Sequence, residues 1–314
     1  MNLSTNRLLL TVLSALVVAA PGGPAAGTSG AGPSRTTSPG PSRSTVLAAV
    51  RTTAPGVSPL PVRGVASPRE LARPAVSCEA CLVVDDRGRV LWSRHPRRRL
   101  PNASTTKMAT ALVVLRDADP SEVVTVSGAA AATGGGGLDL EPGETYTVEA
   151  LLEAMLLTSS NDAAVALAEH VTGSAGAFVE DMNVLAGRLG ARDTHFVTPH
   201  GLDVAGHHSS AADLALIARR LLADDLLAEI VATAGTSIEG PRGLIPLENR
   251  NPLLEGYGGA LGVKTGYTAL AGNVLVAAAR RGGRTVTTVA MDSIDAAEDS
   301  RALLDHGFAR LRRT

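Results

Sequence analysis

Predicted strands lie at both ends of the foldable part of this chain, and helices fill most of the sequence between them. The strand segments combine apolar and β-branched residues and are bounded by turn residues. We expect strands over 80–84, 90–92, 261–265, 273–279 and 285–291. The pattern predicts one mixed sheet that joins the two ends of the domain, with a helical block inserted between its strands.

The inserted block, roughly residues 120–235, shows mostly helical patterns. We expect helices over 104–115, 147–157, 162–171, 175–189 and 210–222, and a closing helix over 296–311. A short strand is expected at 123–126 and a flexible glycine run at 134–137. The glycine run is not followed by the Lys-Ser/Thr pair of a phosphate-binding loop, so it is interpreted as a plain loop.

The amino-terminal part of the chain differs in composition from the rest. Arg7 followed by the apolar run 8–20 is typical of an export signal, and an uncleaved anchor is the alternative. We assign 1–26 to this signal or anchor, and 27–75, rich in Pro, Gly, Ser and Thr, to a disordered linker. The domain then covers 76–314. We expect it outside the cytoplasm, either secreted or tethered through its N-terminus to the outer face of the membrane.

Composition argues against nucleic acid as a partner. The formal net charge of −1 argues against a nucleic-acid binder, and because aromatic residues make up 2% of the chain, stacking on bases is not expected either. Cys78 and Cys81 are the only cysteines. Residues three apart in a strand face opposite sides, and zinc would need two more ligands. Free thiols and a local bridge therefore both stay open.

Only two lysines, Lys107 and Lys264, occur in the chain, although Lys and Arg together number 29. Biased coding accounts for the excess of arginine. An ammonium can give up its proton once it is desolvated, whereas a guanidinium cannot. The two lysines are therefore candidates for chemistry that arginine cannot perform, and each stands in a short polar motif.

Ser104 and Lys107 are three residues apart at the start of an expected helix, so their side chains share one face. Lys107 can then accept the hydroxyl proton of Ser104, while the helix N-terminus favours the developing negative charge. Taken alone, this motif is equally consistent with a capped helix on the surface.

Two further motifs lie later in the chain. Ser159 and Asn161 are two residues apart in an interhelical loop, where a hydroxyl can pass a proton and an amide can orient a substrate. Lys264, Thr265 and Gly266 lie on an expected strand. The glycine leaves room for a substrate beside the strand edge, and the other two can bind a carboxylate. Taken alone, an ordinary loop and an edge strand would account for both motifs.

The three motifs occur together in the order found in penicillin-binding proteins and class A β-lactamases. From about residue 75 to 308 the chain resembles the D-alanyl-D-alanine carboxypeptidases, the low-molecular-mass penicillin-binding proteins. The likeness is carried by residues 101–108, 159–163, 182–183, 198–202, 208–211 and 262–268. It implies a β-lactamase/transpeptidase-like α/β (α+β) fold, in which both ends of the domain form an antiparallel sheet with flanking helices and an inserted helical block.

The resemblance also implies a function. An enzyme of this kind removes the terminal D-alanine from peptidoglycan stem peptides through an acyl-enzyme, is acylated by β-lactams, and uses no metal or cofactor. The implied catalytic residues are Ser104 as nucleophile, Lys107 as general base and Ser159 as proton relay. The implied substrate-binding residues are Asn161, Lys264, Thr265, Gly266 and Tyr267. The backbone N–H groups of Ser104 and Tyr267 would form the oxyanion hole.

Two features depart from the family pattern. Ser160 stands where glycine is usual, and its hydroxymethyl group either narrows the cleft or is harmless. Many relatives add a β-rich domain and an amphipathic anchor after the closing helix, and neither is expected here. Any contact with a membrane is therefore expected through the N-terminus.

Three other functions fit part of the pattern. A class A β-lactamase needs a glutamate in a Glu-x-x-Leu-Asn stretch; Glu180 comes nearest, but it lies in an expected helix with Val184 in place of the Asn. A non-catalytic wall-binding module would not need an intact Ser104 and Lys107. A metal hydrolase would need carboxylates at ligand spacing with the histidines. None accompanies His195, His200, His207 and His208.

Overall fold

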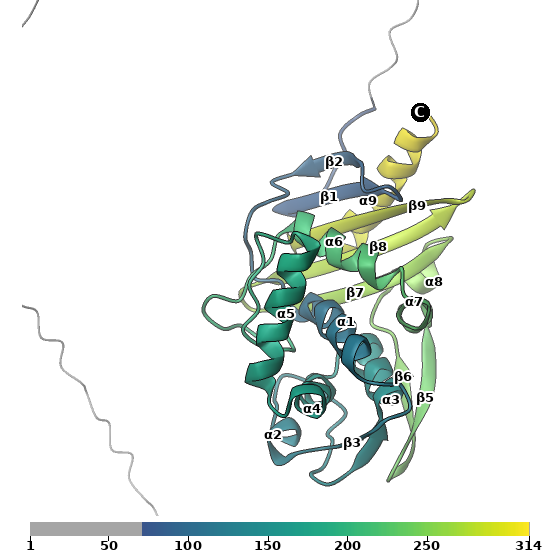
Figure 1. Ribbon diagram of the computed structural model, residues 1–314. Coiled ribbons are helices and arrows are strands. Elements are labelled where there is room, and N and C mark those ends of the chain that lie inside the picture. Colours follow the sequence, from purple (N-terminus) through teal and green to yellow (C-terminus); the bar gives the residue numbers. More distant parts are fainter. Residues whose placement is uncertain (1–70, 314) are drawn as a thin grey trace, which may run out of the picture. The chain divides into compact units, whose positions relative to one another are not determined.

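A five-stranded sheet links the two ends of the described chain (Figure 1). The computed structural model describes residues 71–313. The strands lie in the order β2–β1–β9–β8–β7. Their bounds are β1 Ala80–Asp85, β2 Val90–Arg94, β7 Ala260–Thr268, β8 Gly272–Arg281 and β9 Arg284–Ser293.

All four pairings in this sheet are antiparallel. The prediction of one sheet built from both ends of the domain is therefore confirmed, and so is the antiparallel arrangement implied by the resemblance. The prediction of a mixed sheet is wrong. Short turns join β1 to β2 and β7 to β8 to β9, and such turns can connect only antiparallel neighbours.

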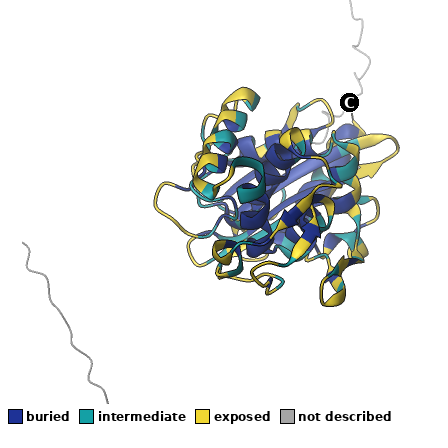
Figure 2. Ribbon diagram, turned by 60° about the horizontal axis from the view of Figure 1, so that its bottom comes forward, coloured by how far each residue is buried: buried dark blue, intermediate teal, exposed yellow. Residues whose placement is uncertain are grey.

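Helices cover both faces of the sheet (Figures 1 and 2). Side chains alternate along β1: Leu82 and Val84 enter the larger core, whereas Cys81 and Val83 enter the smaller one. The smaller core lies under α9 (Ala296–Leu311). The larger core lies under α1 (Lys107–Asp117) and α6 (Ala211–Leu221) and continues into the helical block.

The helical block contains α3 (Val148–Glu153), α4 (Asn161–Thr172) and α5 (Ala175–Leu189). The hydroxyl of Thr147 accepts the N–H of Ala150, which caps α3 at the predicted residue. After α3 the chain continues as the π-helical turn η2 (Ala154–Thr158). The predicted helix over 147–157 is therefore present but changes its winding before the second motif.

Several elements were not predicted. They are α2 (Gly128–Ala131), β4 (Thr145–Thr147), α7 (Asp225–Ala232), the hairpin of β5 (Gly235–Gly240) and β6 (Gly243–Glu248), and α8 (Leu253–Gly256). The predicted strand near 123–126 is β3 (Val123–Thr125), and β4 is its partner. In the β5–β6 hairpin only Ile238 and Leu247 are buried, so its sequence carries little strand alternation.

Cys78 and Cys81 form a disulfide. Cys78 precedes β1, which begins at Ala80, so the bend that the bridge needs lies outside the strand. The signal or anchor predicted for 1–26 and all but the last five residues of the predicted linker lie outside the described residues. The domain boundary at residue 76 stays a prediction. Between residues 71 and 313 no helix has the length and apolarity to cross a membrane.

Candidate active site

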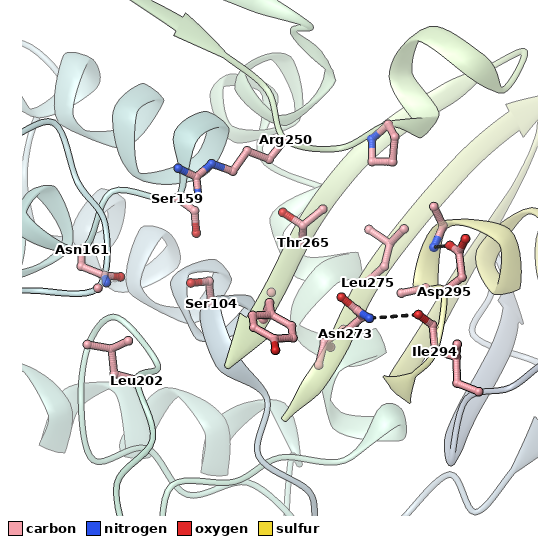
Figure 3. A pocket seen from close by; sticks show the side chains of 17 residues that line it. Ser104, Ser159, Asn161, Leu202, Arg250, Thr265, Asn273, Leu275, Ile294 and Asp295 are labelled. Atoms are coloured by element: carbon pink, nitrogen blue, oxygen red, sulfur yellow. Dashed lines mark hydrogen bonds between the residues drawn. The ribbon is translucent and has the colours of Figure 1, made fainter. Parts of the chain in front are cut away.

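The three motifs meet at one cleft of about 550 Å³ (Figure 3). Ser104 comes from the 3-10 turn η1 (Ala103–Thr106), directly before α1. Ser159 follows η2, Asn161 is the first residue of α4, and Thr265 lies on the edge strand β7. The other lining residues are Gly135, Leu202, Arg250, Pro252, Gly266, Tyr267, Asn273, Val274, Leu275, Ile294, Asp295, Ala296 and Ala297.

Local hydrogen bonds fix the turn that carries Ser104. The hydroxyl of Thr105 donates to the carbonyl of Asn102 at 2.6 Å, and that of Thr106 donates to the carbonyl of Ala103 at 2.8 Å. Gly201 packs against the same turn, and a Cβ at this glycine would lie 2.0 Å from the Ala103 oxygen. The nucleophile candidate is therefore held by contacts on both sides of its backbone.

Lys107 is fully buried behind Ser104, and its ammonium faces three oxygen atoms. Nζ lies 2.8 Å from Ser104 Oγ, 2.6 Å from Asn161 Oδ1 and 2.8 Å from the His200 carbonyl oxygen. Burial lowers the pKa of Lys107 well below its usual value, and the charges of Lys264 and Arg250 lower it further. A neutral Nζ could donate to Asn161 and His200 and keep its lone pair for the Ser104 hydroxyl.

Ser159 and Asn161 reach the cleft because the chain turns sharply between η2 and α4. Ser159 has a positive φ of 68°, which ends the helical winding. The side chain of Asn161 donates to the carbonyl of Gly134 at 3.0 Å, and its backbone N–H donates to the carbonyl of Gly136 at 3.0 Å. The predicted glycine loop is therefore a wall of the cleft that α4 holds at its first residue.

Ser160 does not narrow the cleft. Its side chain is fully buried and donates a hydrogen bond to the carboxylate of Asp162. Asp162 also accepts the N–H groups of Leu138 and Leu140, both at the end of the glycine loop. The hydroxymethyl group thus belongs to the anchor of the cleft wall, and its φ of −57° is one that any residue adopts.

The third motif divides between the two faces of β7. Lys264 is 2% exposed, and Gly266, on the same face, packs against η1, where a Cβ would lie 3.0 Å from the Ser104 nitrogen. Thr265 and Tyr267 line the cleft together with Gly266, whereas Lys264 does not. Burial lowers the pKa of Lys264 to about 7, and the charge of Arg250 acts in the same direction. The glycine thus allows the strand to approach the nucleophile turn closely.

A profile of the D-alanyl-D-alanine carboxypeptidase family matches residues 67–295. The chain belongs to this family. A D-alanyl-D-alanine carboxypeptidase of Bacillus subtilis is 39% identical over 219 residues, which are 68% of this chain and 56% of the relative. One of Mycobacterium tuberculosis is 37% identical over 232 residues, 71% of this chain and 79% of the relative. The chain thus spans little more than half the length of the Bacillus relative.

Solved structures of related proteins share the fold. A D-alanyl-D-alanine carboxypeptidase from Mycobacterium tuberculosis superposes with a TM-score of 0.72 at 36% identity, covering 75% of this chain and 92% of that one. A Streptomyces DD-transpeptidase superposes with a TM-score of 0.73 at 30% identity, covering 76% of this chain and all of that one. The β-lactamase/transpeptidase-like fold expected for the family is therefore confirmed.

Two charged residues of this carboxypeptidase-family site were not predicted. Arg250 lines the cleft, and its guanidinium points toward Ser159 (Figure 3). Asp162 anchors the glycine loop from beneath. Arg250 lies in a segment without a predicted element, and Asp162 follows Asn161 as an ordinary first-turn acid would. Asp162 lies in the stretch 159–163 that carries the family likeness but was given no role, and no sequence signal marks Arg250.

The four histidines do not form a metal site. His207 Nδ1 accepts the N–H of Val197, and Nε2 bonds the hydroxyl of Thr106 at 2.8 Å. Burial lowers the pKa of His200 and of His207 to about 4, so both are neutral at neutral pH. His195 and His208 pair through their backbones. Across residues 71–313 no three His, Cys, Asp or Glu side chains are arranged to hold a metal ion.

The acid that a class A β-lactamase would need has no counterpart in this cleft. Glu180 is exposed on α5 and is not among the lining residues. Asp295 is the one acid that lines the cleft, within the described part of the chain. Its Oδ1 accepts the N–H groups of Ala297 and Glu298 and so caps α9.

Proposed function

We propose that this protein is a serine D-alanyl-D-alanine carboxypeptidase that removes the terminal D-alanine from peptidoglycan stem peptides. The observation that carries the proposal is the 2.8 Å contact between Ser104 Oγ and the fully buried Nζ of Lys107 at the wall of an open cleft. A desolvated amine within hydrogen-bond reach of a hydroxyl is the arrangement that activates a serine nucleophile.

Acylation would begin with proton transfer from Ser104 Oγ to Lys107 Nζ. Oγ then attacks the carbonyl carbon of the peptide bond between the last two D-alanines. The carbon–nitrogen bond breaks, the amine leaves with a proton relayed by Ser159, and an ester remains on Ser104. The N–H groups of Ser104 and Tyr267 would stabilise the oxyanion, and one such donor is worth about 10²–10³ in rate. The tight packing of Gly266 on the Ser104 backbone supports this pairing.

Substrate binding would use both faces of β7. Thr265 and Arg250 line the cleft where the terminal carboxylate would lie, and Lys264, buried on the other face of β7, would contribute its charge from beneath. A carboxylate bound there would favour the charged form of Lys264 and so raise its pKa from about 7. Asn161 would hold the peptide amide. Tyr267 and Gly266 leave the strand edge open for an extended peptide, which can add to a sheet edge through its backbone.

Water would hydrolyse the ester in a second step and restore Ser104. The absence of a glutamate among the cleft-lining residues of 71–313 supports slow deacylation of a β-lactam adduct, because the carboxylate that does line the cleft, Asp295, is engaged in capping α9. β-Lactams would therefore inhibit the enzyme covalently. The proposed setting is the cell envelope, outside the cytoplasm, and the net charge of −1 argues against a nucleic-acid partner.

Muropeptide digestion tests this function. The full chain is incubated with pentapeptide muropeptides, and mass spectrometry should find the loss of one alanine per stem, whereas Ser104→Ala should leave the peptides intact. A long-lived penicillin adduct on Ser104 is expected as well. Fast penicillin turnover would favour a β-lactamase, and failure to form any adduct or product would favour a non-catalytic wall-binding module.

A further inference from the structure

Seven exposed arginines gather at the end of the sheet remote from the cleft. We call this group the arginine end; it consists of Arg87 and Arg89 after β1, Arg280, Arg281 and Arg284 around the β8–β9 turn, and Arg310 and Arg312 at the end of α9. The pairing of Asp85 with Val286 places the β1–β2 turn beside the β8–β9 turn. The guanidinium of Arg281 lies 4.9 Å from the centre of the Phe308 ring. This contact places the C-terminal end of α9 beside the β8–β9 turn.

The helix α9 separates the arginine end from the cleft. Its cap, Asp295, lines the cleft, and Arg312 follows its last residue. Sixteen residues at 1.5 Å each make the helix about 24 Å long. A surface that contacts the arginine end therefore leaves the mouth of the cleft open.

Most of this positive charge is not neutralised by neighbouring acids. Ion pairs within residues 71–313 join Arg89 to Asp85 and Arg281 to Asp305, and a longer one at 3.8 Å involves Arg284. The other four arginines of the group form no ion pair within 4.0 Å among the described residues. They are Arg87, Arg280, Arg310 and Arg312. A cluster of guanidinium groups facing solvent is suited to phosphate oxygens, which they bind in bidentate fashion.

The opposite end of the domain is acidic. Residues 117–187, which include α3, α4 and most of α5, contain 12 Asp and Glu and no Lys or Arg, and Arg188 follows in the last turn of α5. The helical block and the C-terminal end of α9 lie at opposite sides of the folded domain (Figure 1). Because the whole chain carries a net charge of only −1, the arginine end reflects segregation of charge rather than an excess of it. An anionic surface would attract one end and repel the other.

The described chain also begins beside the arginine end. The ring of His306, in the last third of α9, hydrogen-bonds the backbone of Ala72. The 70 preceding residues therefore enter here, and their sequence includes the apolar run 8–20.

From these observations we infer that the arginine end docks on the anionic phospholipid headgroups of a membrane and directs the cleft and the acidic block away from the bilayer. The chain entry beside the arginines favours lipid over a free wall polymer as the source of phosphate. Juxtamembrane basic residues contribute cumulatively to such binding, and salt screens them. The inference does not depend on the catalytic roles assigned above.

Vesicle flotation of the full chain tests the inference. Vesicles of phosphatidylcholine alone are compared with vesicles that also contain phosphatidylglycerol, and the second should bind the protein at least tenfold more tightly at low salt. The double variant Arg280→Glu/Arg312→Glu should lose about 30-fold in affinity for the anionic vesicles. The control Arg188→Glu/Arg192→Glu makes the same charge change at the exposed end of α5 and should change affinity less than threefold.

Three results would overturn the inference. Equal binding of the unaltered chain to both vesicle types would assign membrane contact to the apolar run alone. An equal loss in the two double variants would assign it to overall charge. Binding to soluble poly(glycerol phosphate) that anionic vesicles cannot compete away would assign the arginine end to a wall polymer. Covalent labelling by fluorescent penicillin reports that each variant is folded.

Discussion

The reactivity proposed for Ser104 depends on the basicity of one buried amine. Lys107→Arg preserves the charge and removes the basicity, since a guanidinium keeps its proton at any pH that proteins tolerate. We expect acylation by fluorescent penicillin to slow at least 10³-fold, near the upper part of the range for general-base catalysis. Stopped-flow labelling measures the rate, and circular dichroism checks that the variant is folded.

Lys264→Arg is the matched control, because it makes the same change in the other buried lysine. Its charge would still attract a carboxylate, so acylation by penicillin should fall less than in the Lys107 variant. Comparable acylation rates in Lys107→Arg and the unaltered protein would contradict the base assignment.

The pH dependence of kcat/KM should separate the two lysines. Lys107 acts in its neutral form, so kcat/KM should rise as pH increases through its lowered pKa. Lys264 binds the carboxylate in its charged form and has a pKa of about 7, so kcat/KM should fall as pH increases beyond about 7. This profile reports the free enzyme. In Lys264→Arg the falling limb should move to higher pH, and an unchanged limb would assign it to another group.

At the scale of elements, the cleft depends on a loop that is held by one carboxylate. Asp162→Ala would leave the N–H groups of Leu138 and Leu140 without their acceptor and free the wall that also bonds Asn161. We expect a loss of about 2–4 kcal/mol in the free energy of unfolding and a rise in KM. Urea unfolding and steady-state hydrolysis of a D-Ala-D-Ala peptide measure the two effects.

Ser160→Gly provides the comparison within the same anchor. It removes a single hydrogen bond to Asp162 and leaves the loop contacts in place, so we expect a smaller loss of about 1–2 kcal/mol and a KM within threefold. A clear gain in activity in Ser160→Gly over the unaltered protein would instead show that the hydroxymethyl group obstructs substrate.

The elements differ in how well the sequence predicts them, for a physical reason. α5 was predicted closely because Ser174 caps it, Gly190 ends it with a φ of 78°, and its apolar face repeats regularly. The β5–β6 hairpin was missed because it buries only Ile238 and Leu247 and includes Pro246. Alternation of buried and exposed residues is the signal for a strand, and an exposed hairpin has almost none.

The site shows the same division. Ser104 and Lys107 lie one helical turn apart, so their contact is local and can be read from the sequence. Arg250 acts on Lys107, and Asp162 bonds the glycine loop at Leu138; both partners are distant in sequence. An arginine or an aspartate alone is compatible with many roles. The resemblance to a family supplied the joint meaning of the three motifs, which no single spacing contains.

At the scale of the whole molecule, the first described residues are connected to the last helix across the sheet. Asp299 on α9 makes this connection. Its carboxylate is 5% exposed and accepts hydrogen bonds from the backbone N–H and hydroxyl of Ser77, the N–H of Cys78 and the hydroxyl of Ser293 on β9. One side chain therefore ties the entry of the chain, the central sheet and the closing helix together.

Asp299→Ala should accordingly destabilise the entire domain rather than its edge. Two N–H groups and two hydroxyls would lose their acceptor in a largely buried place, and we expect a loss of about 3 kcal/mol in the free energy of unfolding. For a domain of this size the melting temperature should fall by about 6–12 °C in a single transition. Glu298→Ala, one residue earlier and exposed, is the control and should shift it by less than 2 °C. Scanning calorimetry decides: a separate early transition for the N-terminal segment, with the main transition unchanged, would mean that the two ends of the chain do not stabilise each other.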